Sequence, residues 1–225
     1  MGLKYVHMLV AGIILGGMAM FPHHGSAEAI RLPPPAASGD MSVETALQKR
    51  RSVRDYQDGP LALADVSRLL WAAQGITSEN GYRTAPSAGA LYPLEVYLVA
   101  GRVTDLPAGV YRYRPHGHKL VKTAGGDLRS ELAGAALGQR AVRDGAVALV
   151  LAGVYERTTA KYGRRGVPYV HMEVGCAAQN VYLQAESLGL GTVFIGAFDD
   201  AKVKALLEMP DAQQPLGIMP IGKPE

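Results

Sequence analysis

The sequence predicts one α+β domain, in which a central mixed β-sheet is flanked by helices. Its 225 residues, 48% hydrophobic and 19% charged, supply enough apolar material for one core and too little for two. Strand-like and helix-like segments follow one another without an internal repeat. The formal charge of +3 is spread among residues of both signs, which excludes the basic stripe of a nucleic-acid-binding protein.

The first 29 residues have the layout of a secretory signal peptide. A positively charged start precedes the apolar run 8–21, and an Ala-x-Ala cleavage site ends at Ala29. The run is about fourteen residues long, shorter than the roughly 20 that span a bilayer, although a retained anchor stays the alternative. We therefore expect export to the periplasm, a Pro-rich linker over 30–40 and a folded domain over 41–225.

The first half of this domain shows two helices and three strands. Apolar residues recur at helical spacing over 42–50 and 61–75. An apolar run predicts a strand over 94–101, and alternating apolar residues around a polar turn at 115–117 predict a hairpin over 109–123.

The second half begins with a short helix, expected over 127–137. A continuous apolar run predicts a strand over 145–155 that is buried on both faces. The longest helical pattern follows over 167–188, and the small residues 175–178 in it could pack against a second copy of the chain across a two-fold axis. A core helix within one subunit is the alternative.

The glycines near 189–196 resemble a dinucleotide-binding fingerprint, but their order is wrong. That fingerprint needs a strand before the glycines and a helix after them, whereas here a helix precedes them and a strand over 191–198 follows. A Rossmann nicotinamide site is thereby excluded.

A last helix over 199–209 should begin at Asp199 or Asp200 as its cap, and an apolar run closes the chain.

Cysteine and histidine give no sign of a metal site. Cys176 is the single cysteine, which excludes an internal disulfide and a cysteine-based metal cage. Its small neighbours in a helical pattern predict an inert, buried thiol, with pairing between chains as the alternative. His116 and His118 share a polar turn with no third ligand near them.

Arginine is concentrated where the first helix ends. In "KRRSVRDY" the guanidinium groups of Arg50, Arg51 and Arg54 and the hydroxyl of Ser52 lie within five residues. Guanidinium forks bind phosphate oxygens in pairs, so these residues predict a phosphate site. A solvated basic patch is the alternative.

Small residues mark two further stretches. The loop Pro86 to Gly89 could let the backbone press against a flat ligand, with Pro93 at the entry to the strand. Gly196 and Ala197 end an apolar strand, so their N–H groups could face a ligand instead of being screened by side chains. Ordinary tight turns are the alternative for both stretches.

Taken in order, these stretches resemble the nitroreductase family of FMN-dependent oxidoreductases, in particular its SagB-type dehydrogenase branch. The resemblance runs from about Val43 to Pro224 and rests on "RRSVRDY", "APSAGALYPLEVY", "KYGRRGVPYVHMEVGCAAQNVYLQAESLGLGT", "IGAFDD" and "IGKP". It implies a nitroreductase-like fold and a homodimer with FMN at the interface. The implied cofactor-binding residues are Arg50, Arg51, Ser52, Arg54 and Lys223 at the phosphate and ribityl chain, Pro86, Ser87, Ala88 and Gly89 from the other subunit at the isoalloxazine ring, and Gly196 and Ala197 at its N5 edge.

The resemblance also implies an activity, a two-electron hydride transfer through flavin N5 in a ping-pong cycle. The substrate stays open among quinones, nitroaromatics and azoline-like compounds. In SagB-type azoline dehydrogenases a Lys-Tyr pair removes a proton, and Lys161 and Tyr162 are the candidates for that role, with an exposed helix end as the alternative.

Many relatives carry further basic residues beyond the position of "GKP", whereas this sequence stops at Glu225. Phosphate binding would then depend on Arg50, Arg51, Arg54 and Lys223. A cofactor-free or flavin-binding but non-catalytic protein on the same scaffold is therefore the alternative function.

Overall fold

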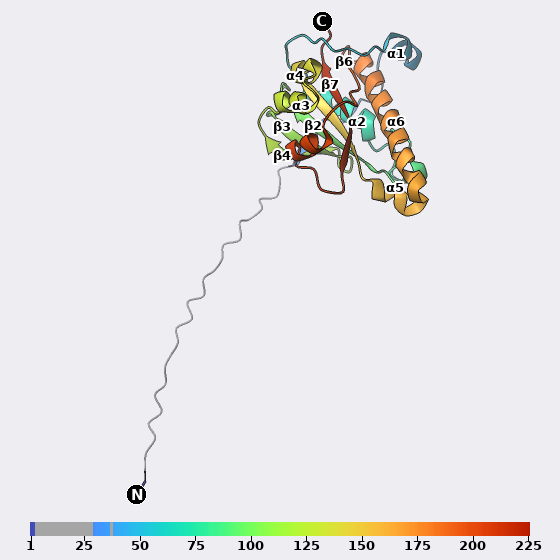
Figure 1. Cartoon of the computed structure of the whole chain (residues 1–225). Coiled ribbons are helices and arrows are strands. Elements are labelled where there is room, and N and C mark those ends of the chain that lie inside the picture. The colour runs from blue at the N-terminus through green and yellow to red at the C-terminus, as the bar shows by residue number, and fades with distance from the viewer. Residues whose placement is uncertain (3–28, 37) are drawn as a thin grey trace.

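The protein was analysed as a computed structural model that describes residues 1–2, 29–36 and 38–225 (Figure 1). The expected signal peptide therefore lies almost entirely outside the described residues. Within the part that is described, no helix is both long enough and apolar enough to cross a membrane.

A seven-stranded sheet forms the centre of the domain, in the order β1-β4-β3-β2-β5-β7-β6. Its strands are β1 Ala29–Arg31, β4 Lys119–Gly125, β3 Gly109–Arg114, β2 Leu94–Ala100, β5 Val147–Gly153, β7 Gln214–Gly222 and β6 Gly191–Thr192. The expected α+β class is confirmed, but every ladder is antiparallel, so the sheet is not mixed. Short connections join β2 to β3 and β3 to β4, and such connections can only link antiparallel neighbours.

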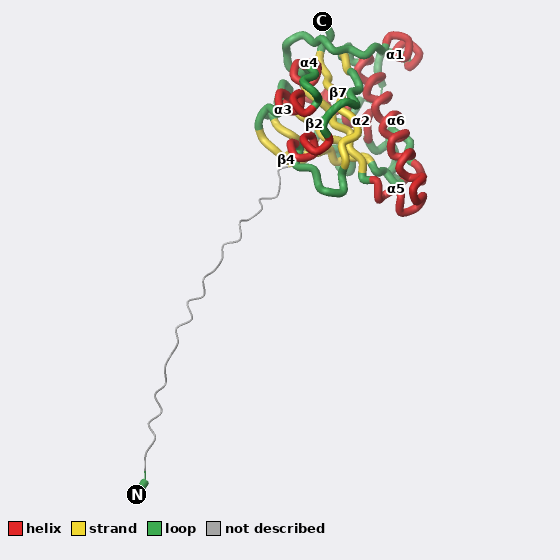
Figure 2. Tube along the Cα trace, in the orientation of Figure 1, coloured by secondary structure: helices red, strands yellow, loops and turns green. Residues whose placement is uncertain are grey.

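Helices cover both faces of the sheet, as Figure 2 shows with strands in yellow between red helices. The helices are α1 Val43–Lys49, α2 Leu63–Gln74, α3 Arg129–Ala135, α4 Arg140–Asp144, α5 Tyr155–Tyr162, α6 Gly166–Ser187 and α7 Asp200–Leu206. Helices α2 and α6 pack on one face, and α3, α4 and α7 pack on the other.

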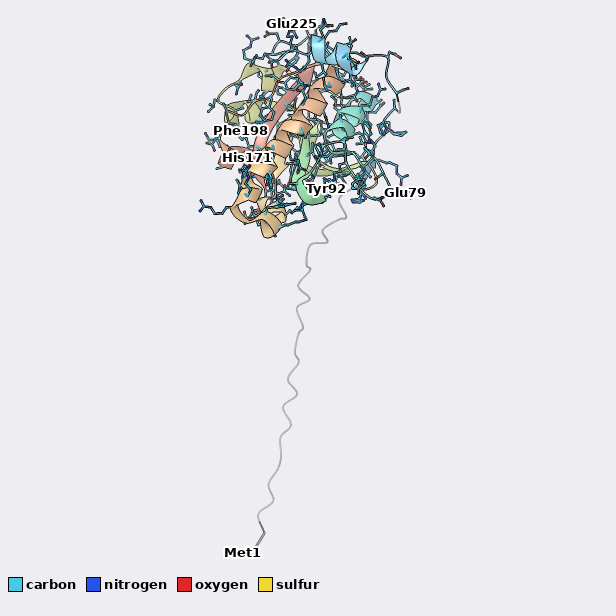
Figure 3. All side chains as sticks on the ribbon, turned by 90° about the vertical axis from the view of Figure 1, so that its right-hand side faces the viewer. Met1, Glu79, Tyr92, His171, Phe198 and Glu225 are labelled. Atoms are coloured by element: carbon cyan, nitrogen blue, oxygen red, sulfur yellow. The ribbon has the colours of Figure 1, made fainter. Side chains whose placement is uncertain are left out.

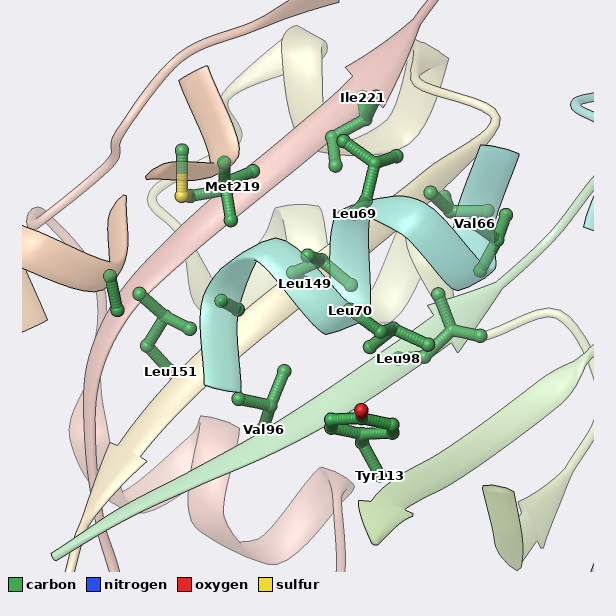
Figure 4. Packing of buried hydrophobic residues seen from close by; sticks show 14 of the residues in the cluster. Val66, Leu69, Leu70, Val96, Leu98, Tyr113, Leu149, Leu151, Met219 and Ile221 are labelled. Carbon is green, nitrogen blue, oxygen red and sulfur yellow. The ribbon is translucent and has the colours of Figure 1, made fainter. Parts of the chain in front are cut away.

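Each central strand contributes to two cores. On β2, Val96 and Leu98 point toward α2, where they meet Leu69 and Leu70 (Figure 4). Tyr97 lies in the second core, with α3 and α4. Because both faces are buried, the apolar and polar alternation of a half-exposed strand is absent, which is why the sequence of β2 is apolar apart from Glu95.

The folded part begins earlier than expected. Residues 29–31 pair with β4, and the Leu32 N–H donates to the His118 carbonyl at 3.0 Å. Leu32 is buried, and the Ser67 hydroxyl lies 2.7 Å from Nε2 of His118. The first residues of the predicted linker over 30–40 are therefore docked on the sheet, so 41 is too late a start for the domain.

The strand expected over 191–198 is wrong in its extent. Only Gly191 and Thr192 form β6, and Ile195 adds a single bridge to Ile218 of β7. Between them the Phe194 N–H donates to the Tyr182 hydroxyl at 2.7 Å, which takes the backbone out of the ladder. The closing apolar run instead forms β7, which lies inside the sheet.

Two helices had no counterpart in the sequence prediction. Helix α4 has five residues, too few to show a periodic pattern. Helix α5 buries only Thr158, so it carries no apolar stripe to be recognised. The other helices lie close to their expected ranges, and Asp199 caps α7 as one of the two expected residues.

Candidate functional site

The arginine-rich segment leaves α1 and runs beside the edge strand β6. Ser52 forms a bridge with Thr192, and the Val53 N–H donates to the Thr192 carbonyl at 2.9 Å. The Arg50 guanidinium lies 5.2 Å from the centre of the Tyr182 ring on α6. The expected phosphate-binding segment is thus fixed against the sheet edge by its backbone.

The Tyr182 hydroxyl joins this segment to the segment around Phe194. Its oxygen accepts the Phe194 N–H at 2.7 Å and lies 3.1 Å from Oγ of Ser52. When Tyr182 donates its own proton to Ser52, the Ser52 hydroxyl keeps its proton for an acceptor on a ligand. Sequence reasoning missed Tyr182, although a tyrosine among small helical residues was an available signal.

The end of the chain returns to the same edge. The Gln57 N–H donates to the Lys223 carbonyl at 2.9 Å, and Tyr56 forms a bridge with Pro224. The side chains of Lys223 and Arg54 are exposed and make no ion pair with any described residue. Both cations are therefore free to meet an anion.

Arg51 has a contact that the sequence did not indicate. Its NH1 group donates to the carbonyls of Gln48 and Arg50 at 3.0 and 2.8 Å, at the C-terminal end of α1. These bonds satisfy carbonyls that a helix end leaves without partners. Arg51 thus stabilises α1 with one nitrogen and keeps the others for a ligand.

Gly196 and Ala197 lie exposed beside the sheet edge. Both are exposed, and a Cβ added to Gly196 would meet only the Phe194 ring, at 3.9 Å. The Ala197 carbonyl accepts from Gln139 at 3.1 Å, while neither residue's N–H has a hydrogen-bond partner among the described residues. These N–H groups are available donors.

The open donors and the free cations lie along one line. Gly196 follows Ile195, which forms a bridge with Ile218, and Lys223 stands five residues after Ile218. At roughly 3.3 Å per residue Lys223 lies about 17 Å from that bridge, and Gly196 lies on the other side of it. The edge therefore suits an elongated ligand with an anionic end.

The loop Pro86 to Gly89 lies elsewhere, against α5. Gly89 has a φ of 63°, and a Cβ there would come within 2.8 Å of the Tyr162 hydroxyl and 3.2 Å of the Lys161 Nζ. The Ser87 hydroxyl accepts the Tyr92 N–H at 2.9 Å. Within one chain, then, the positive φ disfavours a side chain at Gly89, and such a side chain would also displace the ends of Lys161 and Tyr162.

Helix α6 separates these two groups of residues. Figure 3 shows Phe198 and Tyr92 on opposite sides of it. The structure therefore brings the arginine segment together with Lys223 and Ala197, and the loop together with α5. It does not bring the two groups together within one chain.

Glu173 is a buried acid beneath the loop that sequence reasoning missed. It is 4% exposed, and its Oε1 has no hydrogen-bond partner in the described part of the chain. Burial raises its pKa to about 7, against the opposing effects of the Ser87 hydroxyl and the charge of Arg83. An acidic residue on an otherwise apolar helix face was the available signal.

One expectation about α6, the buried Cys176, is wrong, while the packing of residues 175–178 against a second copy stays a prediction. Cys176 is exposed, not buried, and so is Gly175, whereas Ala177 and Ala178 lie in the core. Four consecutive residues cannot share one helix face, because each is turned by about 100° from the last. The small-residue stripe 175–178 is therefore divided between the surface and the core.

Known proteins resemble most of this chain. Residues 47–223 match the family described as Nitroreductase family. A Methanocaldococcus jannaschii protein that bears a nitroreductase name is 48% identical over 184 residues, which are 82% of this chain and 92% of that protein. The microcin B17-processing protein McbC of Escherichia coli is 32% identical over 156 residues, which are 66% of this chain and 57% of McbC. A crystal structure of a Ralstonia eutropha protein, also under a nitroreductase name, has a TM-score of 0.76 at 30% identity and covers 89% of this chain and 92% of its own.

Proposed function

Since this chain belongs to the nitroreductase family, as its match over residues 47–223 and its relatives show, we propose that it is an FMN-dependent oxidoreductase that works as a homodimer. The observation that carries the proposal is the row of uncommitted donors along the sheet edge. It begins with the cations Arg54 and Lys223 and ends with the free N–H groups of Gly196 and Ala197.

The residues at the cationic end fit a phosphate dianion. Arg50, Arg54 and Lys223 supply positive charge, and the free proton of the Ser52 hydroxyl supplies a neutral donor. Guanidinium groups bind such oxygens in pairs, which is stronger than a bond between neutral groups. Arg51 would add its uncommitted nitrogens.

The other end fits a ring that gains negative charge on reduction. Backbone N–H groups stabilise such charge without any movement of side chains. When bound, FMN supplies reversible two-electron chemistry, with hydride exchanged at its N5 atom. Gly196 and Ala197 leave space for it because no side chain covers their N–H groups.

A second copy of the chain would complete the site. In one chain Phe198 and Tyr92, which follow the edge residues and the loop, lie on opposite sides of α6 (Figure 3), so the loop over the ring would come from the partner subunit. Exposed apolar side chains on α1 and α6, among them Val43 at 63% and Met172 at 57%, provide a surface for that partner to cover.

Lys161 and Tyr162 would then reach the site with the partner's loop, because both lie against Gly89. An ammonium and a phenol at this place can hold and pass a proton of the substrate. The McbC relative, whose name describes microcin processing, supports a SagB-type reaction on an azoline-like compound. Quinones and nitroaromatics remain substrate classes of the same proposal.

The chain from Ala29 onward, purified and mixed with FMN, tests this function. We expect a yellow dimer that keeps its flavin on gel filtration and is turned over by one member of a panel of electron donors and acceptors. A protein that stays colourless would contradict the proposal. A yellow protein without turnover on any pair would match the non-catalytic alternative.

We further propose a periplasmic location, on the signal-like composition of residues 1–29. Amino-terminal sequencing of the protein from a cell envelope fraction should give Ile30 as the first residue. Recovery of the uncleaved chain from the cytosol would contradict it.

A further inference from the structure

Strands β2 and β3 run apart at one end of the sheet. Their ladder begins only at Tyr97 and Arg112, whereas β2 starts at Leu94 and β3 continues to Arg114. A cavity of about 460 Å³ occupies this gap, and we call it the β2–β3 cavity. Its lining residues are Gln74, Arg83, Leu94, Glu95, Val96, Tyr113, Arg114, Pro115, His116, Lys119, Val121 and Arg157. Small-molecule sites have volumes of this order.

The lining of the cavity carries an excess of positive charge. Its single carboxylate, Glu95, is already paired with Arg112 at 2.9 Å and with Arg157 at 2.6 Å. Arg114 and Lys119 form no ion pair with any residue that the structure describes. Their charges are therefore available to a ligand.

A buried amide in the lining also lacks a partner. Gln74 is 1% exposed, and its Oε1 accepts from Arg83 at 2.7 Å. Its Nε2 has no acceptor among the described residues. An unsatisfied buried donor is costly, and an oxygen of a ligand in the cavity would remove that cost.

The remaining wall is apolar. This part of the wall consists of Leu94, Val96, Tyr113, Pro115 and Val121. None of the lining residues belongs to the proposed flavin site. The cavity lies behind the loop Pro86 to Gly89, because Arg83 stacks over the ring of Tyr92, 4.4 Å from its centre, at the end of that loop.

From this combination we propose that the β2–β3 cavity binds a small organic anion with at least two negative charges and an apolar body. Arg83, Arg114 and Lys119 bind the charged group, and the Gln74 amide donates to one of its oxygens. The apolar body lies against Val96 and Tyr113.

Calorimetric titration of the full chain, saturated with FMN, tests the proposal, with phenyl phosphate as the probe. Phenyl phosphate should bind, and phenol and inorganic phosphate should each bind at least about tenfold more weakly, because each lacks one half of the recognition. Arg114→Gln and Lys119→Gln should each weaken phenyl phosphate at least about tenfold, the effect of losing one charge-assisted contact.

Two further variants serve as controls. Arg140→Gln removes an exposed arginine that pairs with Asp144, outside the cavity, and should bind phenyl phosphate like the parent. Arg51→Ala should do the same, because Arg51 contacts the end of α1 and is not among the residues that line the cavity. The proposal is overturned if the parent does not bind phenyl phosphate at millimolar concentration, or if it binds phenol as tightly as phenyl phosphate. It is also overturned if Arg51→Ala loses phenyl phosphate binding while Arg114→Gln keeps it.

Discussion

The two ends of α6 arrange their polar groups in opposite ways. Near Tyr182 the side chains of Arg54 and Lys223 are exposed, and the N–H groups of Gly196 and Ala197 have no partner among the described residues. We call this the edge half of the site.

Near Glu173 the polar groups are packed against one another. Gly89 lies against Tyr162, Ser87 accepts from Tyr92, and Glu173 is buried beneath them. We call this the loop half. The edge half has polar groups open to a ligand, whereas the polar groups of the loop half contact one another. The difference fits the proposal that two chains complete one site.

The largest effect is expected in the loop half, from Glu173→Gln. The pKa of Glu173 is raised from 4.5 to about 7, so between these values the folded state holds a proton that the unfolded state has lost. The parent's free energy of unfolding should therefore fall as pH rises from 4.5 to 7, by up to about 3 kcal/mol. Urea unfolding at several pH values across this range measures the free energy of unfolding.

Glu173→Gln should lack this fall, because an amide does not titrate, and it should be the more stable protein at pH 8. Glu186→Gln, a change on the same helix, provides the matched control and should keep the parent's pH profile. A parent profile unaltered by Glu173→Gln would show that the loop half is not built on a buried acid.

In the edge half, Arg51→Ala should weaken FMN binding tenfold to a hundredfold, as expected for the loss of a charge-assisted contact to phosphate. Arg51→Lys should recover only part of this, because an ammonium cannot form the planar fork. Fluorescence titration of FMN against the parent, Arg51→Ala and Arg51→Lys measures the three affinities.

The contacts of Arg51 with the carboxyl end of α1 predict a smaller, separate loss of stability, about 0.5 to 1 kcal/mol, in the alanine variant. If the three FMN affinities are equal and only the stability changes, Arg51 is a helix cap and not a phosphate ligand.

A smaller effect is expected from Tyr182→Phe. The change leaves the Phe194 N–H without an acceptor and removes the hydroxyl partner of Ser52, which should cost about 1 kcal/mol of stability and several-fold in FMN affinity. Tyr111→Phe removes a hydroxyl that donates to the Pro107 carbonyl at 2.7 Å, away from both halves. This matched variant should leave FMN affinity as it is, and equal losses in both variants would show that the effect of Tyr182→Phe is not specific to the edge half.

The sequence was sufficient to predict elements whose environment is uniform. Strand β5 is apolar throughout, and β2 is apolar apart from Glu95, because both sheet faces are covered, and this pattern predicted where both strands lie. The sequence was not sufficient where a side chain distant along the chain determines where an element ends. Tyr182 ends β6 by binding the Phe194 N–H, and no local pattern records that contact.

The same limit applies to the candidate site. Its residues could be named one by one from their types, such as Arg54 for phosphate and Gly196 for an open backbone. Their grouping could not, since it depends on the end of the chain returning beside the arginine segment and on Phe198 and Tyr92 lying on opposite sides of α6. The exposure of Cys176 was missed for a related reason, because neighbours in sequence do not share a helix face.

The central claim is that the flavin site is completed by two chains, and mixing two defective variants tests it most directly. The first variant carries both Arg54→Ala and Lys223→Ala, which remove exposed cations of the edge half. The second variant, Gly89→Val, obstructs the loop half, because Gly89 has a φ of 63° and an added side chain would contact Tyr162. Each variant alone should bind little FMN. When the two are unfolded, mixed in equal amounts and refolded, half of the dimers should be hybrids with one intact site of two. Flavin binding should then return to about a quarter of the parent's, as measured by FMN fluorescence. No recovery from a mixture that does form hybrid dimers would mean that each site lies within one chain, and would contradict the account.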